Sequence, residues 1–440
     1  MQNLLSKLTH KRVLTVAIPI VLSNSTIPIL GAVDTAVVGQ LGEAVPIGAV
    51  GIGAIIITAI YWLFGFLRMG TTGLTAQAIG AGDKSETSAL LVRALIIGFG
   101  SGLFFIAVQV PLFWGALELA PASLEVEGLA QKYLHIRVYS APAAIALFGI
   151  SGWLIAKEKT RAVLWLQLWI NGINISLDFL FVLHLGWGVE GVAIATLIAE
   201  WSGLGFGLWI AREGFNKGYW RNWVQIFDRS RLLRMAKVNS DIMIRSILLE
   251  IAFVSFLFLG SSFDDATLAA NQVLLQFLNI TAYTLDGFAF AAEALVGQAL
   301  GAKNRALFRK SAVMTSQWGV GSVVLMALAF FVFGDNIIHL MTTAEDVRAV
   351  SHEYLPWMIL APLVGVAAWM LDGIFIGATR TADMRNMMFI SFGIYLIALM
   401  VLLPIYGNHG LWASLIIFSI ARGVTLGVKY PRLEASADIE

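Results

Sequence analysis

The sequence predicts an all-α integral membrane protein in which twelve membrane-spanning helices form two pseudo-symmetric six-helix bundles. Three observations lead to this prediction. Hydrophobic residues make up 58% of the 440 residues and charged residues only 13%, which leaves too little polar material for the surface of a soluble protein. The apolar residues fall into runs of about 20 residues, the length that crosses a bilayer as a helix. Motifs of the first half also recur in the second half.

The apolar runs are separated by short polar segments, and some of them, such as Ala44–Leu67 and Ala94–Leu117, contain no charged residue. The first run has full spanning length and is not followed by a cleavage site for signal peptidase, so we expect it to be retained as a helix. We expect the twelve spans at residues 13–39, 45–68, 91–113, 132–156, 162–184, 190–211, 240–260, 266–296, 311–334, 352–378, 386–406 and 409–428.

The distribution of charge predicts the orientation of the chain. Most of the 29 Lys and Arg residues lie in the terminal tails or in loops that follow even-numbered spans, for example Lys157, Lys159 and Arg161. The loops after odd-numbered spans carry acids such as Glu125 and Asp264. Because cytoplasmic loops of membrane proteins are enriched in Lys and Arg, we expect both termini to face the cytoplasm.

A polar stretch at the midpoint divides the chain into three parts. We expect an N-terminal lobe at residues 1–211, a cytoplasmic linker at 212–238 that lies along the membrane surface, and a C-terminal lobe at 239–440. The segment 77–83 (QAIGAGD) recurs as 298–304 (QALGAKN), and the same offset places Gly39 on Gly260. Such a parallel repeat places a substrate site between or within the two bundles.

Composition and motifs exclude several functional classes. The net charge is only +1, and no basic block is interleaved with aromatic residues, so we expect no binding to nucleic acid. The chain has no Cys and no pair of His residues at metal-binding spacing, so we expect no resident metal and no cofactor. It also lacks a phosphate-binding loop and the motifs of hydrolases, so it is predicted to be a transporter driven by an ion gradient and not an enzyme.

Asp34 is the only charged residue between Val13 and Gly42. A charged group at membrane depth costs roughly 2.5–3.5 kcal/mol, so a carboxyl group that is retained there needs a reason. In an apolar site it can take up and release a proton near neutral pH. Pro19, Pro28 and Gly31 precede it and are predicted to bend or unwind the first span. The alternative is a structural role in which Asp34 pins a broken helix through backbone hydrogen bonds.

Two further acids lie within the predicted spans of the first half. Asp178 follows Asn174 by one helical turn in the fifth span, and residues at this spacing share a helix face. Glu200 follows Thr196 by one turn in the sixth span. We predict that Asp178 and Glu200 act with Asp34 in coupling transport to a proton or another cation, and the alternative for each is a structural hydrogen bond.

The second half contains its own set of membrane acids. Glu250 lies in the seventh span one turn after Arg245, Asp286 and Glu293 share a face of the eighth, and Asp372 lies in the tenth. They form either an alternative cation site or structural latches that pair with neighbouring arginines. Methionine and aromatic side chains suit soft contact with amphipathic ligands, although most aromatic residues of membrane proteins face lipid. Our candidates for the lining of a substrate site are Asn24, Tyr139, Phe277, Tyr283, Phe288 and Met370.

The first span, with Ala17-Ile18-Pro19, Asn24 and Val33-Asp34-Thr35, resembles the opening helix of multidrug and toxic compound extrusion (MATE) transporters. The Gln77-Ala78-x-Gly80-Ala81 turn and the Asn174-x-x-x-Asp178 pair also fit this family. The segments 285–289 (LDGFA) and 371–380 (LDGIFIGATR) resemble its DinF-type branch.

The resemblance implies a MATE-like fold and a secondary-active multidrug efflux antiporter, which exports amphipathic, often cationic compounds such as drugs, dyes and toxic metabolites in exchange for protons. It implies that Asp34, Asn174, Asp178 and Thr196 form a hydrogen-bonded cluster in the N-terminal lobe. Acids near Glu250 and Asp372 form a site in members that use Na⁺, so Na⁺ is the alternative coupling ion.

The expected setting is the inner membrane of a bacterium, where the protein would act as a monomer with lipid and small organic substrates as its partners. A rival function is a flippase for lipids or lipid-linked glycans. Such a flippase would need Arg or Lys in its cavity to hold pyrophosphate, and the expected spans contain almost none apart from Arg137 and Arg245.

Overall fold

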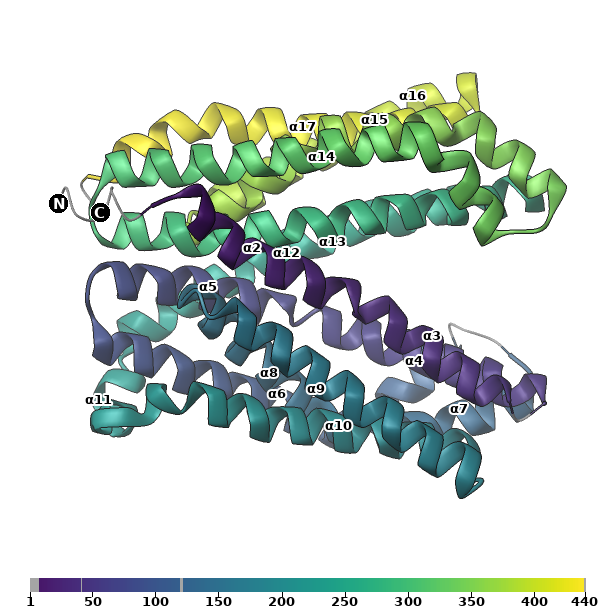
Figure 1. The fold of residues 1–440 in the computed structure, drawn as a ribbon, viewed down its shortest axis with the longest axis horizontal. Helices are drawn as coiled ribbons and strands as arrows, with labels where there is room; N and C mark the ends of the chain where they lie inside the picture. The colour runs from purple at the N-terminus through teal and green to yellow at the C-terminus, as the bar shows by residue number, and fades with distance from the viewer. Residues whose placement is uncertain (1–7, 41, 119–121, 439–440) are drawn as a thin grey trace. The chain divides into compact units, whose positions relative to one another are not determined.

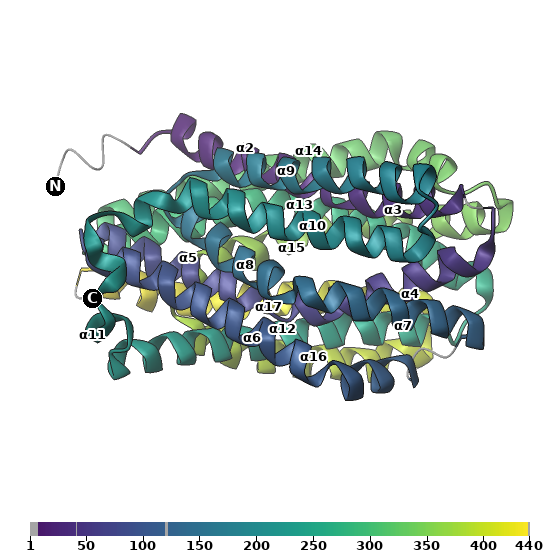
Figure 2. The same cartoon turned by 90° about the horizontal axis from the view of Figure 1, so that it is seen from below.

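A computed structural model of the protein describes residues 8–40, 42–118 and 122–438 (Figure 1). All regular secondary structure in these ranges is helical, and within them twelve helical stretches are long and apolar enough to cross a membrane. The predicted class and the predicted number of spans are therefore confirmed. The helices of each compact part of the chain run side by side along its length (Figures 1 and 2).

The first six spans are built from nine α-helices and two short segments of other helical type. They comprise α2 (His10–Ser25) with α3 (Ile27–Gly39), α4 (Ala44–Trp62) with α5 (Gly65–Gly80), α6 (Lys84–Glu118), α7 (Leu124–Arg137) with the 3-10 turn η1 (Val138–Ser140) and α8 (Ala141–Ala156), α9 (Thr160–Asp178) with the π-helical segment η2 (Phe179–His184), and α10 (Gly188–Ile210). The 3-10 segment η3 (Ala211–Arg221) and the short helix α11 (Trp223–Ile226) follow.

The last six spans are single long helices. They are α12 (Arg229–Gly260), α13 (Asp265–Gly301), α14 (Arg305–Met341), α15 (Glu345–Gly377), α16 (Thr381–Tyr406) and α17 (Asn408–Ser436). Several extend beyond the predicted spans because their ends are polar. Thus α12 begins at Arg229, and residues 229–238, which we expected in the linker, form its first turns. The side chains of Asp264 and Asn304 cap α13 and α14 by accepting hydrogen bonds from Thr267 N and Leu307 N.

The first span is interrupted at the position where its prolines predict a bend. Helix α2 ends at Ser25 and α3 begins at Ile27, with Thr26 between them. Pro28 lies in the first turn of α3, where its missing N–H leaves no hydrogen bond unmade, and Pro19 lies inside α2. The sequence of the first span therefore explains its division into two helices.

The chain packs into two compact units. Unit 1 comprises Met1–Val21, Ala76–Gly82 and Arg234–Glu440, so far as these are described, and unit 2 comprises Leu22–Thr75 and Asp83–Leu233. The start of the first span and the end of the second span thus belong to unit 1, although both lie in the first half of the sequence. The lobe boundaries at residues 211 and 239 were drawn along the sequence, and they stay a prediction.

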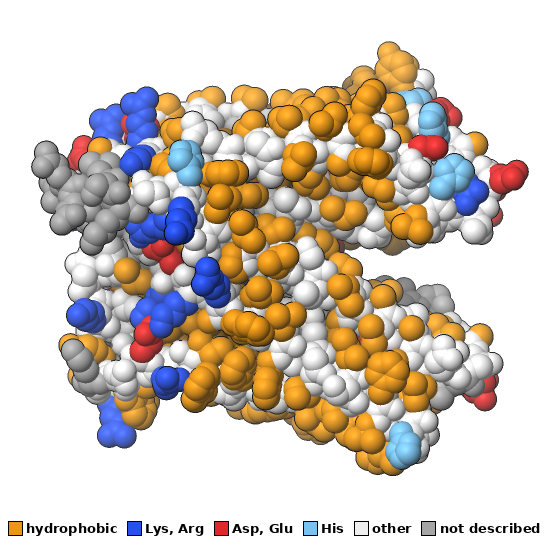
Figure 3. Space-filling model, in the orientation of Figure 1, with side chains coloured by type: hydrophobic (Ala, Val, Ile, Leu, Met, Phe, Trp, Pro, Cys, Tyr) orange, Lys and Arg blue, Asp and Glu red, His pale blue; other side chains and the backbone are white. Residues whose placement is uncertain are grey.

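Each unit has an apolar interior of large side chains. In unit 1, the ring of Phe256 lies 4.5 Å from that of Trp412 and Phe277 lies 4.9 Å from Phe330, measured between centroids. In unit 2, one cluster surrounds Trp153 and another surrounds Tyr133. Apolar side chains also cover the outer sides of the helices, whereas Lys and Arg gather near one end of the helices of each unit (Figure 3).

Candidate functional site

Two carboxyl groups of unit 2 approach each other inside the apolar part of the chain. Asp34 lies on α3, and Asp178 is the last residue of α9 and is fully buried. The two groups are close enough to interact electrostatically. Within the described residues, Oδ1 of Asp34 and both side-chain oxygens of Asp178 are buried and accept no hydrogen bond of ordinary length.

Asn174 and Thr196 join this pair from two neighbouring helices. Asn174 lies one turn before Asp178 on α9, is fully buried, and donates from Nδ2 to Oγ1 of Thr196 on α10 over 3.2 Å. Thr196 in turn donates to the carbonyl oxygen of Val192 over 3.0 Å. The amide oxygen of Asn174 is buried without a partner in the described part of the chain. We call Asp34, Asn174, Asp178 and Thr196 the N-half cluster.

The backbone changes its helical type directly after the N-half cluster. Helix α9 continues beyond Asp178 into the π-helical segment η2, where the amide of Leu185 donates to the carbonyl of Leu180 over 2.9 Å. Such wide turns are rare and are frequently found at functional sites. Sequence reasoning gave no sign of this segment.

Glu200 has different surroundings from the N-half cluster. Its carboxylate forms a bidentate ion pair with Arg137, with Nη1 to Oε2 at 2.9 Å and Nη2 to Oε1 at 3.2 Å. Arg137 also donates to Oγ of Ser140 over 2.7 Å, and the hydroxyl of Tyr61 donates to the carbonyl oxygen of Arg137 over 3.1 Å. The positive charge of Arg137 also acts on Asp34. Glu200 is thus held by a cation, whereas Asp178 has no cationic partner among the residues that the structure describes.

In unit 1, Asp372 is held between two buried arginines. Arg422 approaches Oδ2 of Asp372 to 2.6 Å, and Arg245 contacts the same oxygen. Our sequence reasoning missed Arg422, which lies inside the expected twelfth span. Two guanidinium groups on one carboxylate leave a surplus positive charge, which repels a further cation.

The remaining acids of the second half do not gather into one site. The side chain of Glu250 is exposed on α12, Asp286 is half-buried, and Glu293 is buried. Asp286 and Glu293 both interact with other groups. Across residues 8–40, 42–118 and 122–438, no three His, Cys, Asp or Glu side chains form a group that could hold a metal ion.

The candidate lining residues divide into accessible and buried sets. Tyr139 is half exposed, and Asn24 and Tyr283 are partly exposed. Phe277, Phe288 and Met370 are buried within unit 1, where the sulfur of Met370 fills the space beside Gly319. These three side chains pack in the interior of unit 1 in this structure.

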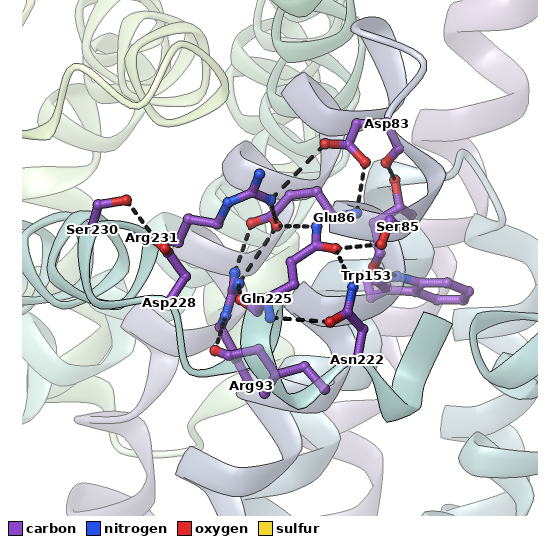
Figure 4. Close-up of polar contacts among 12 residues, drawn as sticks. Asp83, Ser85, Glu86, Arg93, Trp153, Asn222, Gln225, Asp228, Ser230 and Arg231 are labelled. Carbon is purple, nitrogen blue, oxygen red and sulfur yellow. Dashed lines mark hydrogen bonds and ion pairs between the residues drawn. The ribbon is translucent and has the colours of Figure 1, made fainter. Parts of the chain in front are cut away.

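A second polar network, which sequence reasoning also missed, fixes the linker to unit 2 (Figure 4). Arg93 on α6 is only 2% exposed and pairs with Glu86 at 2.6 Å. It also donates to the carbonyl oxygens of Gln225 and Ile226 in α11 over 2.6 and 2.8 Å. Arg231, at the start of α12, pairs with Glu86 as well. The linker is therefore anchored by a buried arginine in addition to its expected contact with the membrane surface.

Comparisons with known proteins agree on one family. The family model described as MatE matches two stretches of the chain, residues 19–180 and 242–402. DNA damage-inducible protein F of Escherichia coli (strain K12) is 37% identical over 425 residues, which cover 94% of this chain and 91% of that protein. Probable multidrug resistance protein NorM of Bacillus cereus is 23% identical, with 92% of this chain and 91% of that protein covered.

The fold has close counterparts among solved structures. The Vibrio cholerae MATE transporter VcmN in the bent form superposes with a TM-score of 0.88 at 21% sequence identity, covering 100% of this chain and 99% of that one. The similarity extends over the whole length of both chains.

Proposed function

The chain belongs to the MatE family, whose members are multidrug and toxic compound efflux transporters and not enzymes, and from this premise we propose that it exports amphipathic, often cationic organic compounds in exchange for protons. The resemblance to MATE transporters is thereby confirmed, and so is the resemblance to the DinF-type branch. The observation that carries the proton assignment is the pairing of Asp34 with Asp178 in the N-half cluster.

Two carboxyl groups that share an apolar site resist simultaneous ionisation, because the second negative charge is repelled by the first. The pair therefore favours holding a proton that one of its members can release. We propose that Asp34 is the coupling carboxylate and Asp178 its partner. The orphaned oxygens of Asp178 support this role, since a carboxyl group fixed in a permanent ion pair would have no reason to exchange a proton.

Asn174 and Thr196 are proposed to complete the coupling site. The hydrogen bond between them leaves the amide oxygen of Asn174 free to accept a hydrogen bond from a neutral carboxyl group beside it. Glu200 is proposed to act indirectly, because it holds Arg137, whose positive charge reaches Asp34.

The rival functions have weaker support. A Na⁺ site built from Glu250, Asp286, Glu293 and Asp372 would have to form beside the two guanidinium groups that hold Asp372. A flippase for lipid-linked pyrophosphate would need free basic groups, but Arg245 and Arg422 are both engaged with Asp372.

We place the protein in the inner membrane of a bacterium with both termini in the cytoplasm, where it would work as a monomer in contact with lipid. Two observations support the location. The relative with the highest identity reported above is a bacterial protein. The basic residues also follow the distribution typical of cytoplasmic loops.

The test is export of an amphipathic cationic dye, such as ethidium, from proteoliposomes under imposed gradients. The wild-type protein should export the dye when a pH gradient is applied and should stop when a protonophore is added. Asp34→Asn should abolish this export while leaving expression and folding near normal, because an amide cannot release the proton.

The same assay distinguishes the rival ion. Export driven by a Na⁺ gradient alone, which Glu250→Gln or Asp372→Asn stops and Asp34→Asn does not, would contradict the assignment to protons and to the N-half cluster.

A further inference from the structure

A polar cavity of about 540 Å³ lies in unit 2, away from the residues of the N-half cluster. It is formed where α9 begins and where α10 passes into η3, that is, at the ends of the fifth and sixth spans. Its lining consists of Lys159, Trp209, Ile210, Arg212, Glu213 and Asn216. The proposed transport mechanism uses none of these residues.

The cavity carries a surplus of positive charge. Glu213 is its one acid, and it pairs with Lys159 at 2.7 Å and with Lys157 beside the cavity. Arg212 donates one hydrogen bond, from Nη1 to the carbonyl oxygen of Trp209 over 3.1 Å, and forms no ion pair with any described acid. Three cations thus face a single carboxylate, so the local charge favours an anion.

A row of stacked aromatic rings leads away from Arg212 along the outside of α10. The guanidinium of Arg212 lies 4.5 Å above the ring of Trp209. Trp209 stacks on Phe206 at 5.8 Å, and Phe206 stacks on Trp169 of α9 at 5.0 Å. Trp209 and Trp169 are 59% and 44% exposed. We call Trp169, Phe206 and Trp209 the aromatic row.

The row begins at a charged end and continues into the apolar part of the helices. Phe206 and Trp209 lie three residues apart on α10, so they share one face of the helix and are separated by roughly 4.5 Å along its axis. Arg212 follows Trp209 by three residues, at the start of η3. Trp residues next to a basic group are typical of the boundary between headgroups and acyl chains. A ligand that matches both parts must therefore be amphipathic and negatively charged at one end.

We propose that this cavity and the aromatic row bind one anionic phospholipid. Its phosphate lies against Arg212 and Lys159, and Asn216 provides a further polar contact for the headgroup. An acyl chain lies along the exposed faces of Trp209 and Trp169. The site lies at the end of the spans that the charge distribution assigns to the cytoplasm, where the membrane leaflet carries its anionic lipids.

The proposal is tested by native mass spectrometry of the full-length protein with added phosphatidylglycerol or phosphatidylcholine. The wild type should retain one phosphatidylglycerol molecule at lower lipid concentration than is needed for phosphatidylcholine. Arg212→Gln should weaken retention of phosphatidylglycerol about fivefold, the loss expected for one basic group near an anionic lipid, and should leave phosphatidylcholine unchanged. Trp209→Leu should weaken both lipids.

Arg221→Gln is the matched control, because Arg221 also lies on the linker with its guanidinium 4.5 Å above a tryptophan ring but does not line the cavity. It should retain phosphatidylglycerol as the wild type does. If Arg212→Gln does not fold, as judged by its thermal unfolding in detergent, Lys159→Gln takes its place.

Three results would overturn the proposal. Equal retention of the two lipids by the wild type would show that the charge of the cavity does not favour phosphatidylglycerol over phosphatidylcholine. An equal loss in Arg212→Gln and Arg221→Gln would assign the effect to the general basic surface. Displacement of the lipid by inorganic phosphate at the same concentration as by short-chain phosphatidylglycerol would make the cavity a site for free anions.

Discussion

Glu200 and Asp178 are both acids within membrane-spanning helices, yet in the described part of the chain Glu200 has a basic partner and Asp178 has none. Sequence reasoning identified both as costly groups that need an explanation, and it also noted Arg137 as a rare base inside a span. It could not pair Arg137 with Glu200, because the two residues lie 63 positions apart on different helices. One-dimensional patterns reveal which buried charges exist, whereas their partners depend on helix packing.

Breaking the pair between Arg137 and Glu200 is predicted to destabilise the protein. In Glu200→Gln, the guanidinium of Arg137 would stay buried without its counter-charge, at a cost of about 3–5 kcal/mol. Denaturant unfolding of the purified protein in detergent measures this loss. The double variant Arg137→Gln with Glu200→Gln should recover part of it.

The control is the exposed pair of Lys132 and Glu190, whose charged atoms lie 3.6 Å apart with side chains that are 60% and 51% exposed. Glu190→Gln should cost less than about 1 kcal/mol, because water screens this pair. If Glu200→Gln were as harmless as Glu190→Gln, the pair with Arg137 would not be a structural element of unit 2.

At the scale of helices, two copies of the repeated motif meet in unit 1. A Cβ atom on Gly80, at the end of α5, would lie 2.0 Å from the carbonyl oxygen of Gln298 on α13. A Cβ on Gly301, at the end of α13, would lie 2.0 Å from the carbonyl oxygen of Gln77 on α5. The recurrence of QAIGA as QALGA was visible in the sequence. Its reason, that the backbones of the two helix ends touch, was not.

We predict that Gly301→Ala destabilises unit 1, because the added methyl group collides with backbone atoms that cannot move independently. A cost of about 1–3 kcal/mol is typical of such overpacking. Gly321→Ala in α14 is the matched control, since a Cβ there meets no described atom within 4 Å. It should stabilise the helix slightly, by about 0.5–1 kcal/mol.

Thermal unfolding in detergent compares these two variants with the wild type. A melting temperature of Gly301→Ala that equals or exceeds that of Gly321→Ala would contradict the close approach of α5 and α13.

At the scale of the whole chain, hydropathy predicted the number of spans and the motifs predicted the family, because both depend on local sequence. The composition of the two units was not predictable in this way. Residues 8–21 and 76–82 pack with the second half of the chain, and α2 passes from unit 1 to unit 2 between Val21 and Leu22. Hydropathy predicts that a segment crosses the membrane, but it does not predict which helices pack against that segment.

The point where α2 changes from unit 1 to unit 2 lies between Pro19 and the interruption at Thr26. We therefore predict that the first span bends when Asp34 takes up a proton. Because the chain has no Cys, spin labels can be placed specifically at Ala36→Cys on α3 and Ser176→Cys on α9. The distance between the labels should change with pH, and adding Asp34→Asn should hold it at the low-pH value. A distance that stays constant across the titration would make the first span a static scaffold.

If Asp34 exchanges a proton for the exported compound, proton movement must accompany transport, and it can be measured. Proteoliposomes that contain a pH-sensitive dye are given a gradient of ethidium with no imposed pH or Na⁺ gradient. Ethidium that moves through the wild-type protein should drive protons in the opposite direction, and Asp34→Asn should move none. Ethidium transport that proceeds at the wild-type rate without proton movement, or proton movement that persists in Asp34→Asn, would contradict proton exchange at Asp34.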